Sequence, residues 1–145
     1  MQIANTLQSQ PSQGAANRYY PLPDPGDILY CWFPNVPGTL GPKPRPALVI
    51  NVSPTTHEVE VCFGTSKKTE MIYPGEFVIS KSDTGFPVSG LSFTTKFDMN
   101  RRVQLPFDDN WFKAAPGPTP STPAPRIGSL HPSYVSLARK AACPD

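Results

Sequence analysis

Apolar and polar residues alternate along the middle of the chain with the period of short β-strands. Between residues 58 and 63, Val59 and Val61 alternate with Glu58 and Glu60, which is the pattern of a strand with one face in a core. Runs rich in β-branched and aromatic residues, each bounded by turn residues, predict six strands. They cover residues 27–33, 46–52, 58–64, 76–80, about 91–97 and 101–105.

The first of these runs, residues 27–33, is apolar on both faces. A strand of this kind needs cover on both sides, which a strongly bent barrel obtains from a helix, a partner chain or both. Six short strands of this kind, followed by one helix, predict a mainly β fold with a C-terminal helix, built as a small SH3-like barrel.

The helix is predicted over residues 129–142. Pro132 suits a first helical position, Ser129 or His131 would cap the helix, and Arg139 and Lys140 complement its C-terminal dipole. The residues expected to form its apolar stripe are Tyr134, Leu137, Ala138 and Ala141.

Twenty prolines divide the chain and exclude long helices between residues 21 and 125. The tract 114–127 reads as a polyproline-like spacer rather than as a ligand for another domain. The expected organisation is a flexible N-terminal extension, a barrel, a Pro-rich linker and a terminal helix that packs on the barrel. These parts cover residues 1–22, 23–113, 114–127 and 128–145.

Composition adds limits on class and compartment. A chain of 145 residues with 38% apolar content suits one domain, and a net charge of +2 is no nucleic-acid signature unless the cations cluster. Three cysteines in no paired framework indicate a reducing compartment. Residues 1–17 lack the features of a signal peptide, and no run approaches the ~20 apolar residues of a membrane span, so a soluble, cytoplasmic protein is expected.

Arg45 lies between Pro44 and Pro46 at the start of an apolar strand. Proline fixes its own φ and forces the residue before it into extended geometry, so Arg45 loses little conformational freedom when it binds a ligand. Its planar fork of donors matches phosphate or carboxylate oxygens. An arginine that only snorkels at a strand start remains the alternative.

Thr65 ends a later strand and is followed by Ser66, Lys67 and Lys68. If strands 46–52 and 58–64 form an antiparallel hairpin, the start of the first lies beside the end of the second, and Arg45 and Thr65 become neighbours. A guanidinium and a hydroxyl at one point make a phosphate clamp that would stabilise a pentacoordinate transition state. A polar β-turn explains Thr65–Lys67 equally well in isolation.

The order of these pieces resembles the MazF/PemK family of toxin endoribonucleases, from about Asp24 to Ala142. The resemblance rests on a Gly26-Asp27 start to an apolar strand, a Gly/Pro loop, Arg45-Pro46 before a second strand, and a third strand that ends in Thr65-Ser66-Lys67. It implies the same barrel and metal-independent cleavage of single-stranded RNA by the ribose 2′-OH. No metal or cofactor is then expected, and the implied partners are single-stranded RNA, a second copy of the chain and a cognate antitoxin.

The resemblance assigns catalytic roles to Arg45 and Thr65. Substrate contacts are expected from four further polar residues, Lys43, Ser66, Lys67 and Lys96. Some relatives carry an aspartate as general base in the strand that matches 91–97. This chain has no aspartate there, and Asp98 lies several residues after the matching position. Either the carboxylate of Asp98 or the guanidinium of Arg45 would then take the proton. Loop 34–44 matches one that shapes the substrate groove in relatives, but its different residues transfer no base preference.

Two other interpretations stay open: a non-catalytic barrel of the same fold in which Arg45 grips nucleic acid or an acidic protein, and an unrelated small structural β-domain. The remaining candidates are weaker. His57 is expected in a solvated hairpin tip and His131 at the helix start. Among aromatic side chains that could stack on bases, core or dimer packing is expected for Trp32, Tyr30, Phe63 and Phe93, and Trp111 is the exception because of its polar neighbours.

Overall fold

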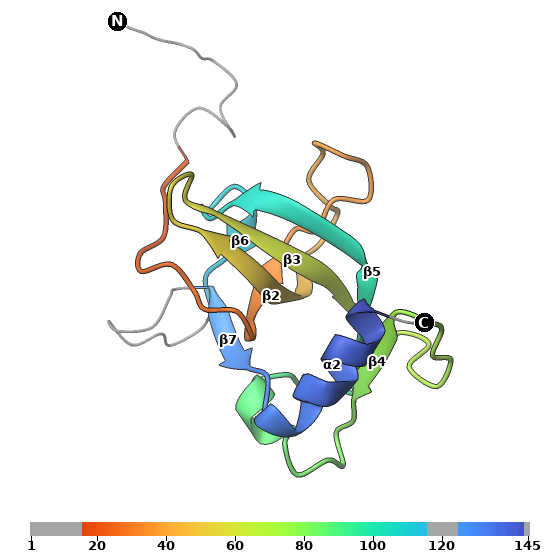
Figure 1. Ribbon diagram of the computed structural model, residues 1–145. Helices are drawn as coiled ribbons and strands as arrows, with labels where there is room; N and C mark the ends of the chain where they lie inside the picture. The colour runs from red at the N-terminus through yellow and green to blue at the C-terminus, as the bar shows by residue number, and fades with distance from the viewer. Residues whose placement is uncertain (1–15, 116–124, 144–145) are drawn as a thin grey trace, which may run out of the picture.

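One curved antiparallel sheet makes up most of the molecule (Figure 1). The computed structural model describes residues 16–115 and 125–143. Within them the sheet has the strand order β4-β5-β3-β2-β1-β6, with β7 also paired to β1. The strands are β1 Asp27–Cys31, β2 Arg45–Ser53, β3 Glu58–Thr65, β4 Glu76–Ile79, β5 Thr95–Pro106, β6 Phe112–Lys113 and β7 Arg126–Ser129.

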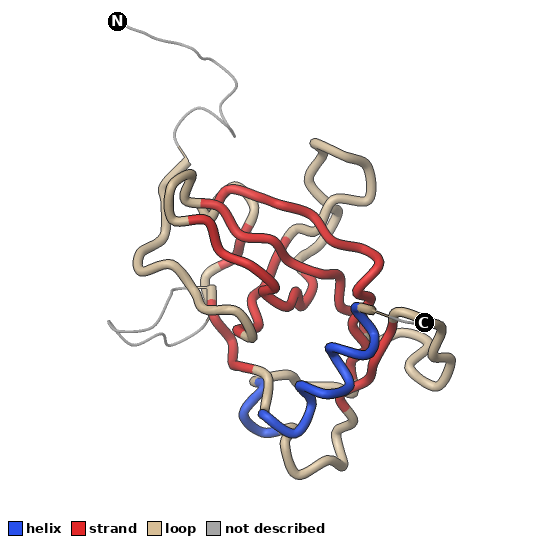
Figure 2. Tube along the Cα trace, in the orientation of Figure 1, coloured by secondary structure: helices blue, strands red, loops and turns tan. Residues whose placement is uncertain are grey.

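The helical elements are short and lie on one side of the sheet (Figure 2). They are the 3-10 turns η1 Pro87–Ser89 and η2 Pro132–Tyr134 and the helix α2 Val135–Ala142. The predicted fold class, a mainly β fold with a C-terminal helix, is therefore confirmed. The sheet bends as in a small barrel, but β4 and β6 stay at opposite edges of the described strand order.

The strand predictions are right for β1 to β4 to within two residues and wrong for β5. The two strands expected at 91–97 and 101–105 are one strand, Thr95–Pro106. Its pairing with β3 shifts between Cys62 and Phe63, so that Cys62 faces Arg102 but Phe63 faces Asp98. This β-bulge lets a polar stretch, Asp98–Arg101, stay inside one strand.

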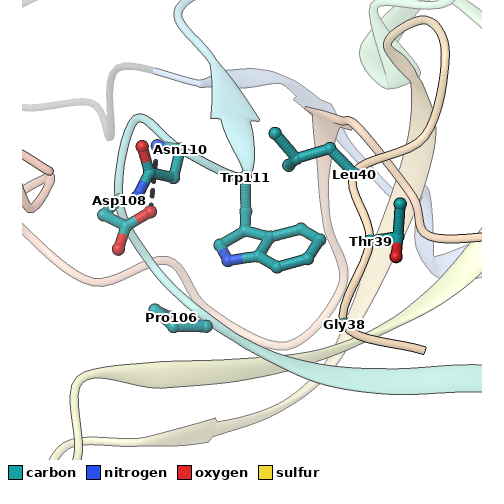
Figure 3. Close-up of a pocket in the computed structure, with 7 residues that line it drawn as sticks. All are labelled: Gly38, Thr39, Leu40, Pro106, Asp108, Asn110 and Trp111. Carbon is teal, nitrogen blue, oxygen red and sulfur yellow. Dashed lines mark hydrogen bonds between the residues drawn. The ribbon is translucent and has the colours of Figure 1, made fainter. Parts of the chain in front are cut away.

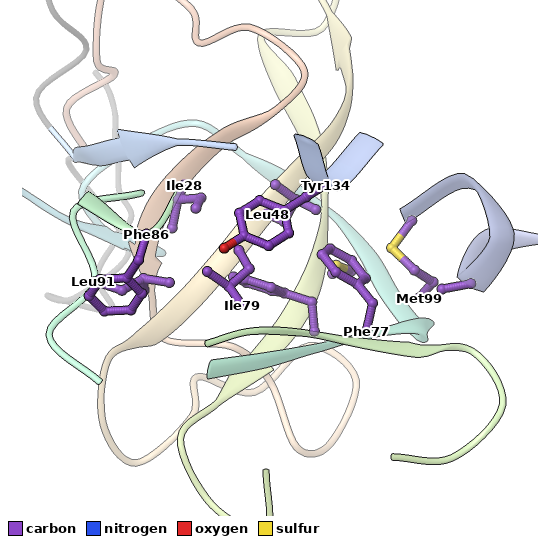
Figure 4. Packing of buried hydrophobic residues seen from close by; sticks show 11 residues of the cluster. Ile28, Leu48, Phe77, Ile79, Phe86, Leu91, Met99 and Tyr134 are labelled. Carbon is purple, nitrogen blue, oxygen red and sulfur yellow. The ribbon is translucent and has the colours of Figure 1, made fainter. Parts of the chain in front are cut away.

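Both faces of the central strands are buried, as the apolar pattern of β1 predicts. Ile28, Leu48 and Cys62 belong to a first core, which α2 covers through Tyr134 and Ala141 (Figure 4). The alternate positions of the same strands, with Phe107 and Phe112, form a second core on the other side of the sheet. The two cores therefore cover much of the central strands, and the polar side chains of the candidate site gather at strand ends, in loops and at the bulge of β5.

The C-terminal helix starts later than predicted. Ser129 is the last residue of β7, and His131 caps η2 by accepting a hydrogen bond from the backbone N–H of Ser133. Leu137 was expected in the apolar stripe but is 49% exposed. In this short helix the core-facing positions are instead Ala138 and Ala141, which follow Tyr134 by one and two turns.

The described parts of the expected extension and linker pack against the sheet. Residues 1–15 and 116–124 lie outside the described residues. From Asn17 onward the extension packs on the sheet: the Tyr19 N–H donates to the carbonyl of Phe107 (3.1 Å) and its hydroxyl to that of Phe112 (3.0 Å). At the other end of the linker Pro125 is buried and β7 begins at Arg126, so residues 125–127 belong to the sheet.

His57 is not the solvated histidine that its loop predicted. Only 7% of it is exposed, and its Nε2 lies 2.8 Å from the carbonyl oxygen of Tyr19. Its ring packs near those of Tyr20 and Phe107. No helix in the described part of the chain has the length and apolar character that a membrane crossing requires.

The Tyr134 hydroxyl connects the helical end to the loop after β4, and it carries a pH-dependent share of stability. It donates a 2.8 Å hydrogen bond to Oδ2 of Asp83. Burial, and then the hydrogen bond and charge of Asp83, raise the pKa of Tyr134 to about 12. An unfolded tyrosine has a pKa of about 10, so this stability is complete below pH 10 and is lost as pH rises towards 12.

We expect Tyr134→Phe to lower the free energy of unfolding at pH 7 by about 1 kcal/mol, because one buried hydrogen bond is lost. Between pH 10 and 12 the variant should lose less stability than the wild type, because it lacks the hydroxyl group that ionises in this range. The buried thiols of Cys31 and Cys62 are present in both proteins and contribute equally to both. Urea unfolding across this pH range measures the difference. The control Tyr20→Phe, at a side chain that is 67% exposed, should keep the wild-type dependence. Parallel pH profiles of wild type and Tyr134→Phe would contradict this account.

Candidate functional site

Arg45 and Thr65 lie side by side at one end of the sheet. Arg45 begins β2, Thr65 ends β3, and the pairing of the two strands sets Ala47 opposite Phe63. Continued by two residues, this register places Arg45 beside Thr65. Side chains two residues apart on a strand share a face, so both point to the same side of the sheet. The hairpin geometry expected from the sequence is therefore present.

Gly64 allows this close approach. A Cβ atom at Gly64 would lie 2.6 Å from the carbonyl oxygen of Pro46 and 2.6 Å from the ring of Phe97. The absence of a side chain at this position brings β2, β3 and β5 together immediately before Thr65. The hydroxyl Oγ1 of Thr65 accepts a hydrogen bond from the backbone N–H of Lys67 (3.1 Å), which orients the threonine at the strand end.

Two guanidinium groups share the ring of Phe63. The Cζ atom of Arg101 lies 3.9 Å from the ring centroid and that of Arg45 lies 5.6 Å from it. Phe33 packs edge-on against Phe63 at 5.3 Å and also faces Arg101 at 5.8 Å. Contact with an aromatic face holds an arginine without occupying its hydrogen-bond donors. The phenyl ring thus gathers two cations beside Thr65 and leaves their donors for a ligand.

A cavity of about 210 Å³ opens next to these groups. Thr65, Lys67, Lys68 and Arg101 line it with donors, and Asp98 contributes a carboxylate. The bulge of β5 sets Asp98 opposite Phe63 and also brings Arg101 close to Phe63. Asp98 is thus in the cavity although it comes later in the sequence than the position of the aspartate in relatives. One oxygen, Oδ1, accepts from the backbone N–H of Asn100 (2.9 Å), which fixes the carboxylate.

Lys96 lines the same cavity, but its ammonium is already bound. Nζ lies 3.0 Å from Oε1 of Glu76 and donates to the carbonyl of Met71 at 2.7 Å. The side chains of Lys96 and Glu76 are only 9% and 12% exposed. The sequence predicted Lys96 as a substrate contact; its geometry is that of a buried ion pair that fixes the cavity wall between β4 and β5.

Of the other predicted substrate contacts, one lines the cavity and two lie outside it. Lys67 lines the cavity, whereas Lys43 and Ser66 are exposed nearby and are not among its lining residues. Sequence reasoning did not single out Arg101 as a site residue and gave Phe63 a role in core or dimer packing, because both depend on the β-bulge, which leaves no local sequence signal. Phe93 lies outside the core and is 65% exposed, because the strand begins only at Thr95.

The cysteines take no part in this site. Cys31 and Cys62 are buried in the two cores, and burial raises the pKa of the Cys62 thiol to about 12 and that of Cys31 as well. A thiol with a raised pKa stays protonated and is a poor nucleophile. In residues 16–115 and 125–143 no group of three or more His, Cys, Asp or Glu side chains is arranged to hold a metal ion.

Comparison with known proteins agrees with this arrangement. Residues 24–105 match the family described as PemK-like, MazF-like toxin of type II toxin-antitoxin system. Among solved structures the fold is similar to an endoribonuclease in complex with its cognate antitoxin from a mycobacterial species. That similarity has a TM-score of 0.53 at 15% identity and covers 83% of this chain and 90% of the other. The search of curated proteins found no match.

The Lys96–Glu76 pair gives a test of whether Lys96 holds the cavity wall. We expect Lys96→Met to lower the free energy of unfolding by about 3–5 kcal/mol, because the Glu76 carboxylate is left buried without a cation and keeps, among the described residues, only the hydrogen bond from the backbone N–H of Tyr73. Replacing both residues, as Lys96→Met with Glu76→Leu, should restore most of the loss. Chemical unfolding of the two variants measures this.

The exposed Lys67→Ala serves as control and should change stability by less than about 0.5 kcal/mol. A Lys96→Met protein of unchanged stability that binds RNA more weakly would instead make Lys96 a substrate contact.

Proposed function

The chain belongs to the PemK-like, MazF-like toxin family of type II toxin-antitoxin systems, and we propose on this premise that it is an endoribonuclease that cleaves single-stranded RNA without a metal ion. The observation that carries the proposal is the meeting of Arg45 and Thr65 at adjacent strand ends. Beside them lies a cavity lined by further cations and two carboxylates, of which Glu76 is paired with Lys96 and Asp98 is in no ion pair with another described residue. These are the groups that in-line attack on a phosphodiester requires.

In the proposed reaction the ribose 2′-OH attacks the adjacent phosphorus. The 2′-oxygen–phosphorus bond forms, the bond to the 5′-oxygen breaks, and the products end in a 2′,3′-cyclic phosphate and a 5′-OH. The nucleophile belongs to the substrate, so the protein supplies position and charge. DNA, which lacks the 2′-OH, would bind but not react.

Each residue has a distinct task in this proposal. Arg45 and Arg101 neutralise the extra negative charge of the pentacoordinate transition state, and the Thr65 hydroxyl donates to a phosphate oxygen. Lys67 and Lys68 contact neighbouring phosphates. The carboxylate of Asp98 takes the proton from the 2′-OH, and the leaving 5′-oxygen takes a proton from water. Lys43 and Ser66, exposed beside the cavity, are proposed as outer contacts to the RNA backbone.

The family also motivates the proposed partners, a second copy of the chain and a cognate antitoxin. Exposed apolar side chains support a docking surface: Ile72, Tyr73 and Leu137 are 52%, 55% and 49% exposed. They border a cavity of about 500 Å³ between β4 and α2. This surface shares Glu76 with the RNA cavity, but Arg101 and Thr65 do not line it.

Cleavage of a labelled single-stranded RNA in EDTA tests the proposed activity. We expect fragments with cyclic phosphate ends, and Arg45→Ala should lower the rate by about 10²–10³-fold, the usual loss when one donor to the transition state is removed. Arg45→Lys should also be impaired because the bidentate fork is lost. Thr65→Val should reduce the rate, while Thr65→Ser should retain most of it.

The control for this assay is Arg139→Ala, at an exposed cation on α2. It should cleave as the wild type does, and it should arrest growth on induction where Arg45→Ala does not. RNA that is shifted on a gel but stays intact would contradict the endoribonuclease proposal and support the alternative, a non-catalytic binding module.

The role of Asp98 is tested separately. Asp98→Asn keeps the size of the side chain and its hydrogen bond from Asn100 but removes the base, so the cleavage rate should fall by about 10²–10⁴-fold. RNA affinity should stay the same or rise, because a negative charge has left the cavity. Single-turnover cleavage and fluorescence anisotropy measure the two quantities. A variant that cleaves at the wild-type rate would leave the proton transfer to another group.

A further inference from the structure

A second cavity, of about 600 Å³, lies between the loop after β1 and the turn before β6. The loop contributes Gly38, Thr39 and Leu40, and the turn contributes Asp108, Asn110 and Trp111. Figure 3 shows the indole of Trp111 with Asp108 and Asn110 on one side and Leu40 and Thr39 on the other. We call this cavity the Trp111 pocket. The residues of its second wall follow position 105, where the family match ends.

The pocket is preformed because Trp32 is hydrogen-bonded to both of its walls. The backbone N–H of Trp32 donates to the carbonyl of Trp111 (2.9 Å), and the carbonyl of Trp32 accepts from the N–H of Gly41 (3.2 Å). A Cβ at Gly41 would overlap the carbonyl of Phe33, so only glycine allows the loop to return this closely. A second anchor is Asn17, whose backbone and side chain both donate to the carboxylate of Asp109.

The Trp111 pocket lies at the same end of the sheet as the candidate catalytic residues. Cys31 of β1 pairs with Arg45 on one side and with Phe112 on the other. Two strand spacings therefore separate Arg45 from Phe112, about 10 Å at ~4.8 Å per spacing. Thr65 is one strand further, about 14 Å away. A nucleotide next to a phosphate held at Arg45 can thus place its base in the pocket.

The chemistry of the pocket suits a base better than a phosphate. The indole offers a flat face for stacking, and Leu40 offers an apolar contact above the rim. Asp108 is 9% exposed, so little water surrounds it, and this burial raises the pKa of its carboxyl group. Its oxygen Oδ1 accepts from the backbone N–H of Asn110 (3.0 Å), which orients the carboxylate. Two neighbouring acidic residues, Asp108 and Asp109, repel phosphate from this place.

We propose that the Trp111 pocket binds the base of an RNA nucleotide next to the scissile phosphate and prefers guanine. Guanine stacks on the indole and presents N–H donors on its Watson–Crick edge to the carboxylate of Asp108, an acceptor that uracil, with two carbonyl groups, matches poorly. The inference rests on the proposed RNA substrate and adds a determinant of base preference to it. The determinant belongs to the 106–111 turn and lies outside the residues matched to the family.

Binding of mononucleotides tests the pocket independently of cleavage. The chain has two tryptophans, so ¹⁵N-labelled protein gives two indole N–H signals, and Trp111→Phe identifies the one from the pocket. We expect the Trp111 signal to shift and saturate with GMP, with a Kd about tenfold lower than for UMP. Inorganic phosphate should not move it. Asp108→Asn should raise the Kd for GMP to about that for UMP, and Arg139→Ala, at an exposed cation on α2, should leave it unchanged.

Each other outcome has a defined meaning. A Trp111 signal that no nucleotide moves, or that all four nucleotides and phosphate move alike, overturns the proposal. A signal that N-acetyl-lysine amide moves and nucleotides do not would identify a pocket for a basic side chain of a protein and would also overturn it. If the protein cleaves RNA but the Trp111 signal does not respond to nucleotides, the proposed base pocket is wrong and the proposed nuclease activity stands. If the protein binds GMP at Trp111 but cleaves no RNA, the proposed nuclease activity is wrong and the base pocket stands.

Discussion

The close pairing of β2 with β3 is the constraint on which the candidate site depends. Gly64 has no side chain, so the carbonyl of Pro46 and the ring of Phe97 both approach its backbone. This contact sets the last residues of the hairpin, and through them the relation of Arg45 to Thr65. Pro46 removes one backbone donor at this place and fixes the direction in which β2 begins. The same contact aligns β5, whose bulge then brings Asp98 and Arg101 to the cavity.

The sequence predicted what short-range patterns encode and missed what tertiary packing decides. Apolar runs and strand alternation located β1 to β4, and the proline-flanked Arg45 and the polar strand end at Thr65 were found because each has a local signal. The bulge in β5 has none, so Arg101 was not singled out as a site residue and Asp98 stayed one of two candidates for the proton transfer. Lys96 has the sequence of an exposed cation, and only the fold brings Glu76 to it. A strand of two residues such as β6 is too short for any periodicity.

The two cavities differ in how they relate to the family. The cavity at Thr65 is built from residues within the 24–105 match, whereas the second wall of the Trp111 pocket follows it. In the proposed function, the reaction is therefore carried by residues within the match, and base preference by a turn that follows it. This division is common where a conserved scaffold carries a constant chemistry and loops vary the ligand.

The buried state of both sheet faces also limits how the substrate can be aligned. Arg45, Cys31 and Phe112 are joined by backbone hydrogen-bonded pairs, so the separation between the two cavities is a multiple of the strand spacing. Neither core leaves room for the central strands to slide, since a shift by one residue would turn apolar side chains outward. In the proposed complex with RNA, the spacing between the bound base and the cleaved bond is accordingly set by the pairing of the strands, so single substitutions in the Trp111 pocket are expected to change which base is accepted without moving the cleavage position.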